Sequence, residues 1–354
     1  MSDRHVRDAL ARVARGEDLA RDAMTSVLRE IMAGDAHPGQ LGALLMGLAI
    51  KGETPDEIAG AAAAMREAMT PVPAASRELV DTCGTGGSGI PRRNVSTAVA
   101  IVLAACGVKV AKHGNRAASS RSGSADVLEA LGVGIAASPQ AVGRCIDDVG
   151  VGFLFAAALH PAMKHAMPVR KALGVRTLFN LLGPLTNPAG ATRQLLGVFD
   201  PARCMPLASA LLALGSTRVM VVHGFREGVT AHEDAPWGID DLSPEGETLV
   251  AHGRGGALQR WVLTPEQAGV DRFGLEEIAG GDPAENAEAL RAVLEGAPGR
   301  YRDAVVYSGA AGLLVAGEQG PEALPQLAAC VASALDDGSA AATLAALVKA
   351  SNPA

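Results

Sequence analysis

The chain has 354 residues, which is enough for about two ordinary domains or one large domain with an attached subdomain. It is 48% hydrophobic but only 3% aromatic, with 42 glycines and 20 prolines, a composition typical of an α/β protein with a core of Ala, Leu and Val. The formal net charge of −7 excludes a general attraction for nucleic acid or anionic lipid, so an anionic ligand needs a local site.

The cysteines and the hydropathy pattern bear on where the protein works. Five cysteines lie far apart and form no Cys-x-x-Cys pair, which argues against a disulfide framework and against a metal cluster. The charged N-terminus does not resemble a signal peptide, and no stretch reaches the roughly 18 uninterrupted apolar residues of a membrane span. We therefore expect a cytoplasmic protein with neither a membrane nor a nucleic-acid partner.

The first seventy residues are predicted to be helical. Apolar residues recur at helical spacing in three segments, and a fourth helix has a clear start signal. Thr54 is a suitable N-cap, Pro55 fits the first helical position, and Glu57 completes a capping box. Pro71 ends this helix near Met69, because proline lacks the N–H that a helix needs. Four helices without a strand predict a small bundle.

After Pro71, short apolar runs alternate with helical patterns. Strands separated by helices indicate a mainly parallel sheet covered on both faces. Ser124 is the expected N-cap of one short helix, and Ser138 that of another which ends near Gly150. Strands are expected at 79–83, 108–112, 151–155, 194–199 and 218–223, a hairpin at 248–250 and 258–262, and later helices from about 282, 300, 321 and 339.

Residues 159–185 have a helical pattern again, interrupted by prolines, so this segment is expected to return to the bundle. The predicted fold class is therefore α/β, with a mainly parallel central sheet. We expect a small all-helical domain from residues 1–72 and about 159–190, and a large α/β domain from residues 73–158 and about 191–354.

A glycine-rich loop at 84–89 follows the first predicted strand. Four glycines in six positions allow positive φ and let successive N–H groups form a nest for a phosphate. The spacing is neither the Rossmann pattern nor a Walker A loop, and a mobile turn is the alternative.

The run Asn-Val-Ser-Thr at 94–97 opens the next helix, where partial positive charge and unsatisfied N–H donors favour an anion. Arg92 and Arg93 add positive charge beside it. Simple capping of the helix is the alternative. Together with the glycine loop, the run predicts a two-sided cradle for a phosphorylated ligand.

The run Lys-His-Gly-Asn-Arg at 112–116 ends the second predicted strand, and a serine-rich stretch follows at 119–124. In an open parallel sheet, ligands bind beyond the carboxyl ends of the strands. Cations and hydroxyls at that edge suit phosphate oxygens. A solvated basic loop is the alternative.

Asp240 and Asp241 lie on a predicted turn. Mg²⁺ prefers carboxylate oxygens, substrate phosphates and water. Adjacent residues on a strand point to opposite faces, so both acids can serve one diphosphate only from a turn or through two ions. Two Mg²⁺ ions are therefore predicted, with an exposed acidic turn as the alternative.

Two histidines and an arginine complete the candidates. Isolated histidines such as His113 and His160 are more often structural residues held by hydrogen bonds than catalytic residues. Arg170 offers a planar guanidinium that suits a carboxylate, and a surface ion pair is its alternative role.

In their order along the chain, these motifs resemble the anthranilate phosphoribosyltransferase family, which has a nucleoside phosphorylase-like fold. Each motif is weak alone, but the ordered set is specific. The matching runs are Gly-Thr-Gly-Gly at 84–87, Asn-Val-Ser-Thr at 94–97, Lys-His-Gly-Asn-Arg at 112–116 with Ser-Ser at 119–120, Ser-Gly-Ser-Ala-Asp at 122–126, Asn-Leu-Leu-Gly-Pro-Leu-Thr-Asn-Pro at 180–188 and Asp-Asp at 240–241.

The resemblance implies an enzyme, a glycosyltransferase of tryptophan biosynthesis, with its active site in a hinge cleft and a homodimer formed through the helical domain. Its substrates would be 5-phosphoribosyl 1-diphosphate, bound with Mg²⁺, and anthranilate. The amine would displace diphosphate at the ribose C1, and no catalytic residue is assigned; His113 and His160 are candidates for orienting the acceptor.

The cradle and the resemblance together predict the site residues. Anthranilate would contact Gly84, Asn115 and Arg170, and the metal would be held near Ser96, Asp240 and Asp241. The phosphoribosyl diphosphate would be bound by Gly84, Gly87, Ser88, Arg92, Asn94, Val95, Ser96, Thr97, Lys112, His113, Gly114, Asn115, Arg116, Ala117, Ala118, Ser119, Ser120 and Ser124.

Several positions depart from the family pattern. Ser88 stands where the family usually has Asp, Arg92 and Arg93 where it commonly has Thr and an aromatic residue, and Asp241 where Glu is usual. These changes add positive charge beside the ligand and shorten one acid, so metal dependence and phosphate affinity are expected to differ. The loop 225–237, beside the predicted metal site, is also longer than the family leads us to expect.

Three alternative functions stay open at this point. A pyrimidine nucleoside phosphorylase has the same fold and similar motifs, although Asn115 and the run at 180–188 favour the transferase. A non-catalytic relative that binds nucleic acid would use the basic cluster of Arg92, Arg93, Arg116 and Arg121. The third is a phosphoribosyltransferase for another aromatic acid.

Overall fold

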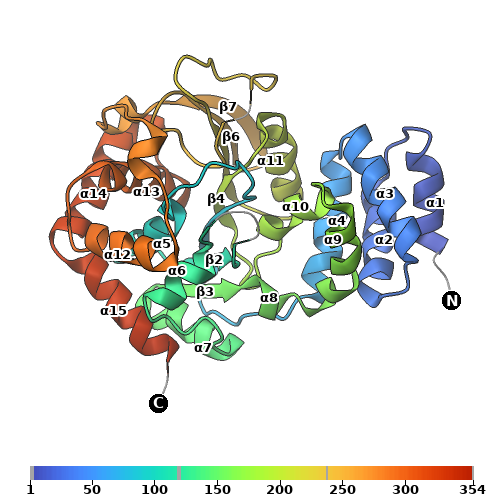
Figure 1. The fold of residues 1–354 in the computed structure, drawn as a ribbon, viewed down its shortest axis with the longest axis horizontal. Helices are drawn as coiled ribbons and strands as arrows, with labels where there is room; N and C mark the ends of the chain where they lie inside the picture. The colour runs from blue at the N-terminus through green and yellow to red at the C-terminus, as the bar shows by residue number, and fades with distance from the viewer. Residues whose placement is uncertain (1–3, 118–120, 237, 353–354) are drawn as a thin grey trace.

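The computed structural model describes residues 4–117, 121–236 and 238–352. The N-terminal helices pack together as a bundle at one end of the molecule (Figure 1, blue). The predicted capping box is confirmed: Thr54 Oγ1 accepts a hydrogen bond from Glu57 N at 3.2 Å, and Glu57 Oε2 accepts one from Thr54 N at 2.8 Å. The bundle helices are α1 (Arg4–Val13), α2 (Arg21–Ala33), α3 (Pro38–Lys51) and α4 (Pro55–Ala68).

A single sheet of seven strands forms the centre of the α/β part, in the order β3-β2-β1-β4-β5-β6-β7. The first five strands run parallel, whereas β6 and β7 form an antiparallel hairpin at one edge. The predicted fold class, with its mainly parallel sheet, is confirmed. The strands are β1 (Val80–Gly84), β2 (Val110–Gly114), β3 (Val151–Phe155), β4 (Arg193–Gly197), β5 (Arg218–Gly224), β6 (Thr248–Arg254) and β7 (Ala257–Leu263).

Both faces of the central strands are buried, whereas most residues of the edge strand β7 are exposed or partly exposed. Alternate residues of β5 enter different cores. Met220 and Val222 belong to the core beneath α5 and the C-terminal helices, whereas Val219 and Val221 belong to the core shared with α11 and the bundle. α11 also packs against α4, so it joins the sheet to the bundle. The covering helices are α5 (Val95–Ala105), α11 (Cys204–Ala213), α12 (Pro283–Leu294), α13 (Arg300–Ala316), α14 (Leu324–Asp336) and α15 (Ser339–Ser351).

Shorter helices connect the strands. α9 contacts α3 and α10 contacts α4, so the interrupted segment does return to the bundle, although the domain limits stay a prediction. These helices are α6 (Ser124–Ala130), α7 (Pro139–Arg144) with a π-helical turn at Cys145–Val149, α8 (Ala156–Leu159), α9 (Met167–Leu173) and α10 (Leu178–Leu182). Turns of 3₁₀ helix lie at Pro161–His165, Gly183–Leu185, Pro201–Arg203, Pro265–Ala268, Leu275–Ile278 and Pro321–Ala323.

The start of α6 differs from the prediction. Gly123 occupies the N-cap position and Ser124 is the first helical residue. A Cβ at residue 123 would overlap the backbone N of Ala117, and Asp126 Oδ2 accepts a hydrogen bond from Gly123 N at 2.9 Å. The Ser124 hydroxyl is instead 3.3 Å from the carbonyl O of Asn115, so it holds the loop after β2.

Within the described residues, no single helix has both the length and the apolar content to cross a membrane; the bent pair Pro321–Asp336 and Ser339–Ser351 meets the test when its two helices are taken together.

Candidate active site

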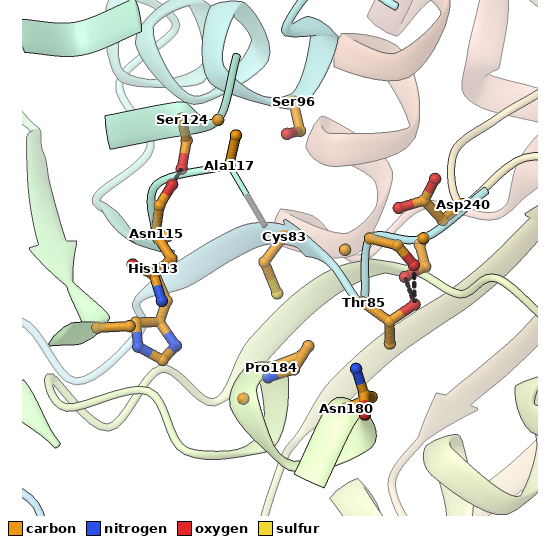
Figure 2. Close-up of a pocket in the computed structure, with 18 of the residues that line it drawn as sticks. Cys83, Thr85, Ser96, His113, Asn115, Ala117, Ser124, Asn180, Pro184 and Asp240 are labelled. Atoms are coloured by element: carbon orange, nitrogen blue, oxygen red, sulfur yellow. Dashed lines mark hydrogen bonds between the residues drawn. The ribbon is translucent and has the colours of Figure 1, made fainter. Parts of the chain in front are cut away.

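A cavity of about 1050 Å³ opens at the carboxyl ends of β1, β2 and β4, between the sheet and the segment that carries α9 and α10. Figure 2 shows side chains from both sides of it, with Ser96 and Asp240 on the sheet side and Pro184 and Asn180 on the α10 side. Every predicted site residue that the structure describes lines this cavity. The predicted residues Ala118, Ser119 and Ser120 lie outside the described part of the chain.

The glycines of the 84–89 loop have two different roles. Gly86 and Gly89 have φ values of +69° and +73°, and no atom lies within 4 Å of where a Cβ would stand, so their backbones face open space. At Gly87, with φ of +93°, a Cβ would lie 2.5 Å from Arg176 Nη2. At Gly84 it would lie 3.2 Å from Asp240 Oδ2. Two glycines therefore leave room for protein side chains, and two leave the loop open to a ligand.

Arg176, which the site prediction did not include, fixes the glycine loop from the opposite side of the cavity. Its Nη2 donates a hydrogen bond to the carbonyl O of Gly87, and its guanidinium lies 4.1 Å from the Phe199 ring centroid. Thr85 fixes the same loop to the end of β4, because its Oγ1 accepts a hydrogen bond from Phe199 N at 3.1 Å. An isolated arginine between two short helices gives no sequence signal for such a contact.

The N-terminus of α5 borders the cavity beside this loop. The Asn94 side chain makes no capping hydrogen bond. Its Oδ1 accepts from Asn286 Nδ2 at 3.1 Å, and its Nδ2 donates to Ser122 O at 3.4 Å. Capping therefore does not explain this side chain. Val95 N and Thr97 N donate to the carbonyl O atoms of Arg93 and Asn94, so Ser96 N is the first-turn N–H group of α5 left to an anion.

Lys112 is buried at the end of β2, with its charge directed toward α5. Its Nζ donates to the carbonyl O of Thr82 at 2.5 Å and to Ser96 Oγ at 3.4 Å. Burial lowers the pKa of Lys112, and the nearby Asp81 carboxylate opposes that shift. The ammonium therefore lies beside Ser96, on the side of the cavity that is predicted to bind phosphate. Thr82 and Asp81, which also act on it, were not among the predicted site residues.

Asp81 is one of the unpredicted groups and is fully buried. Its Oδ1 accepts a hydrogen bond from His113 N at 3.0 Å, and its Oδ2 accepts one from Asn187 Nδ2 at 2.9 Å. Burial raises the pKa of this carboxyl, and the bond from Asn187 lowers it. Asp81 thus fixes the carboxyl end of β2, the strand that carries Lys112 and His113.

Asp240 and Asp241 form the acidic side of the cavity. Asp240 is close to the ends of β1 and β4, since a Cβ at Gly197 would overlap its carbonyl O. Asp241 is partly buried, and desolvation raises its pKa while Arg92 opposes the shift. The interpretation as an exposed acidic turn does not fit, because both carboxyls line the cavity and the Asp240 side chain is only 10% exposed.

The donor set fits magnesium. Two carboxylates and the Ser96 hydroxyl are hard oxygen donors, which Mg²⁺ prefers. Among the described residues, no three His, Cys, Asp or Glu side chains converge as a metal cluster. An ion at Asp240 and Asp241 would therefore take its other ligands from a diphosphate and from water, as Mg²⁺ commonly does.

Two of the predicted cations already have carboxylate partners. Arg116 Nη1 lies 2.9 Å from Asp126 and 2.8 Å from Glu129, on the outside of α6. Arg92 Nη2 lies 2.9 Å from Asp240 Oδ1, and its Nη1 donates to Ser88 Oγ at 3.0 Å. Of the four arginines in the predicted basic cluster, Arg116 is thus engaged in solvent-exposed ion pairs, and Arg92 in an ion pair that is largely shielded from solvent.

The far side of the cavity is less charged. His113 Nε2 and His160 Nε2 are 3.2 Å apart, so one ring donates to the other. Burial lowers the pKa of His113 to about 3, with His160 as a further cause, and lowers the pKa of His160 to about 4. Both rings are consequently neutral at pH 7, and neither supplies an acid or a positive charge there.

Arg170 on α9 lines the same cavity as these two histidines. Its guanidinium is 5.4 Å from the Phe179 ring centroid, and burial lowers its pKa. No carboxylate of the described residues pairs with it, so the alternative of a surface ion pair does not apply. The cavity therefore has a cationic and metal-binding end, and a second end with neutral imidazoles and one arginine.

Family comparisons agree with this two-part arrangement. The model of the glycosyl transferase family's helical bundle domain matches residues 7–69, and the model of its a/b domain matches residues 76–341. The fold and the cavity thus define a two-domain glycosyl transferase.

Individual relatives narrow the family further. The anthranilate phosphoribosyltransferase of Rhodopseudomonas palustris (strain BisA53) is 48% identical over 345 residues, which is 98% of this chain and 98% of the relative. That of Thermus thermophilus has a solved structure with a TM-score of 0.87 and 46% identity, covering 96% of this chain and 98% of that one. The chain belongs to the anthranilate phosphoribosyltransferase family.

One solved relative contains ligands. Anthranilate phosphoribosyltransferase from Saccharomyces cerevisiae, in complex with PRPP and Mg, has a TM-score of 0.86 and 26% identity, covering 99% of this chain and 98% of that one. The resemblance stated from the motifs is therefore confirmed at the level of the family and the fold.

Proposed function

We propose that the protein transfers the 5-phosphoribosyl group of 5-phosphoribosyl 1-diphosphate to the amine of anthranilate. Diphosphate is released, and N-(5-phosphoribosyl)anthranilate is formed for tryptophan biosynthesis. The observation that carries this function is the pairing, in one cavity, of a diphosphate cradle with an arginine that lacks a carboxylate partner among the described residues. Both substrates of such a reaction are acids, and each end of the cavity suits one of them.

The donor substrate, phosphoribosyl diphosphate, binds at the carboxyl ends of the central strands. The open backbones of Gly86 and Gly89, together with Ser96 N in the first turn of α5, present N–H groups to phosphate oxygens. Lys112 adds a buried positive charge on the same side. These groups are already in position in the structure, so they can orient the phosphoribosyl diphosphate without large rearrangement.

Magnesium belongs to the same end. When bound, Mg²⁺ neutralises charge on the diphosphate as it leaves. Asp240, Asp241 and Ser96 are the residues that would hold it. Two ions per site stay a prediction, which rests on the adjacency of the two acids in the chain.

The acceptor binds at the other end. The Arg170 guanidinium pairs with the anthranilate carboxylate, and Asn115 at the end of β2 contributes an amide. The neutral His113 and His160 rings line the site and exclude water. They orient the aromatic ring rather than remove a proton, since an aromatic amine is nucleophilic when neutral.

The chemistry is a displacement at the ribose C1 through an oxocarbenium-like transition state. Cys83 lines the cavity, and desolvation raises the pKa of its thiol well above the ordinary value, so it stays protonated and is not a nucleophile. The amine attacks directly while the cradle holds the leaving diphosphate. Positioning and charge stabilisation account for the rate.

A fluorescence assay tests the function. Anthranilate, phosphoribosyl diphosphate and Mg²⁺ are incubated with the protein, and loss of anthranilate fluorescence is expected. The control omits phosphoribosyl diphosphate. Phosphorolysis of thymidine or uridine in place of this activity would refute the assignment, as would salt-dependent binding to DNA or RNA without transfer.

Assembly and location are parts of the same proposal. A homodimer through the bundle stays a prediction from the family resemblance, and Ile50 on α3, which is 82% exposed, offers a position at which to test it. Size-exclusion chromatography with light scattering, comparing wild type with Ile50→Lys, tests it. The cytoplasmic location stays a prediction from the cysteine pattern; all five cysteines are free thiols in the structure.

A further inference from the structure

The Arg92–Asp240 pair connects the diphosphate cradle to the metal site. Arg92 Nη2 lies 2.9 Å from Asp240 Oδ1, and the two side chains are only 12% and 10% exposed. The second amino group, Nη1, donates to Ser88 Oγ at 3.0 Å. Arg92 is therefore held by both of its terminal nitrogens, one on the loop and one on the acid.

This pair places a cation where a metal ion is expected. A guanidinium on Oδ1 neutralises Asp240 and occupies one of its two oxygens. A divalent ion at Asp240 must then displace the guanidinium or bind beside it against like-charge repulsion. Either route weakens metal binding while Arg92 remains in place.

The displaced guanidinium has a suitable new partner. Arg92 lines the same cavity as Gly86, Gly89 and Lys112, the groups that present donors to a diphosphate. A planar guanidinium binds phosphate oxygens with two parallel hydrogen bonds, as it does a carboxylate. The charge released from Asp240 is thus used by the incoming diphosphate.

We propose that Arg92 is a resident counter-cation of Asp240 that transfers to the diphosphate when the donor substrate binds, and so releases Asp240 to the metal. The inference rests on the proposed function, because it assumes that the cradle takes a diphosphate and that Asp240 is a metal ligand. Two consequences follow. The protein binds diphosphate without metal through Arg92, and it binds metal alone only weakly because of Arg92.

Arg93 provides a matched control. It is adjacent to Arg92 and carries the same charge, but its guanidinium stacks 5.3 Å from the Tyr301 ring centroid. Arg92→Gln and Arg93→Gln therefore change the net charge equally. Only the first removes the contact with Asp240.

Isothermal titration calorimetry tests both consequences on the full-length protein. Inorganic pyrophosphate is titrated in EDTA, and Mn²⁺ is titrated separately without pyrophosphate. Arg92→Gln is expected to weaken metal-free pyrophosphate binding at least tenfold and to tighten Mn²⁺ binding at least threefold. Arg93→Gln is expected to change each by less than threefold. Equal loss of pyrophosphate affinity in the two variants, or unchanged Mn²⁺ affinity in Arg92→Gln, overturns the inference.

Asp240→Asn supplies an independent check that keeps Arg92, so it does not depend on the folding of the Arg92 variant. Loss of the carboxylate frees the guanidinium, so metal-free pyrophosphate is expected to bind more tightly while Mn²⁺ binds more weakly. Unchanged or weaker pyrophosphate binding in this variant contradicts the exchange.

The test separates this inference from the proposed function, since neither titration requires anthranilate. If the Arg92 pattern holds but no transfer to anthranilate occurs, the proposed function fails alone. If transfer occurs but the two arginine variants behave alike, the partner exchange fails alone.

Discussion

Gly87→Ala isolates the contact between the glycine loop and Arg176. Gly86 serves as the control, because both residues have positive φ, +69° at Gly86 and +93° at Gly87, while only Gly87 has a neighbour where the new Cβ would stand. An alanine in this region costs about 1 kcal/mol in backbone strain at either position. At Gly87 the Cβ also displaces the guanidinium.

The extra cost at Gly87 follows from the two contacts that Arg176 would lose. A charged hydrogen bond to a carbonyl contributes about 1.5–3 kcal/mol, and the contact with the Phe199 ring about 0.5–2 kcal/mol. Part of this is recovered because a displaced guanidinium is hydrated. We expect a loss of about 3 kcal/mol for Gly87→Ala against about 1 kcal/mol for Gly86→Ala, and a raised KM for phosphoribosyl diphosphate in Gly87→Ala.

Urea unfolding followed by circular dichroism measures both losses, and an Arg176→Ala background completes a double-mutant cycle. With Arg176 absent, the added cost of Gly87→Ala is expected to fall to that of Gly86→Ala. Equal costs for the two glycine variants in the wild-type background would refute the reasoning. So would a Gly87→Ala cost that is undiminished when Arg176 is removed.

Three further predictions concern the acceptor, the metal and pH. Arg170→Ala is expected to raise the KM for anthranilate at least tenfold while leaving any activity with aniline unchanged; equal losses with both acceptors in steady-state assays would contradict a carboxylate contact. Asp241→Asn is expected to raise the Mg²⁺ concentration needed for half-maximal activity about tenfold, and an unaltered Mg²⁺ titration would exclude Asp241 from the metal site. Burial lowers the pKa of His160 from 6.5 to about 4, so between these pH values the unfolded chain binds the proton first. The stability that neutral His160 contributes is therefore present above pH 6.5 and is lost as pH falls toward 4, by up to about 1.4 kcal/mol per pH unit. In urea unfolding, the free energy of unfolding of His160→Asn should change less between pH 7 and pH 5 than that of the wild type.

Local sequence signals predicted local structure well. The capping box of α4 depends on Thr54, Pro55 and Glu57, which are neighbours in the chain, and it forms as expected. The prediction for α6 was wrong by one residue, because Gly123 must pass close to Ala117, a contact that the helix sequence alone does not contain. Cap preferences describe isolated helix ends, and tertiary packing decided this one.

Long-range pairs could not be predicted in the same way. Arg92 meets Asp240 across 148 positions, and Arg176 meets the Gly87 carbonyl across 89. Motifs identified which residues gather at the sheet edge, because parallel strands bring their carboxyl ends together. They could not specify which cation faces which acid. That pairing depends on the conformation of the loops and on nearby glycines, which leave room for the paired side chains.

The approach of Asp240 to the ends of the strands has a consequence for how this site can change over generations or in the laboratory. A side chain at Gly197 would overlap the Asp240 carbonyl, and one at Gly238 would overlap the Gly224 carbonyl, so almost any replacement there displaces the acids' backbone. The opposite side of the cavity has no comparable constraint at Gly183, which follows α10 and where a Cβ would meet nothing within 4 Å. Libraries that seek new aromatic acceptors should therefore vary Gly183, keep Arg170 and Arg176, and leave the acid-bearing turn untouched.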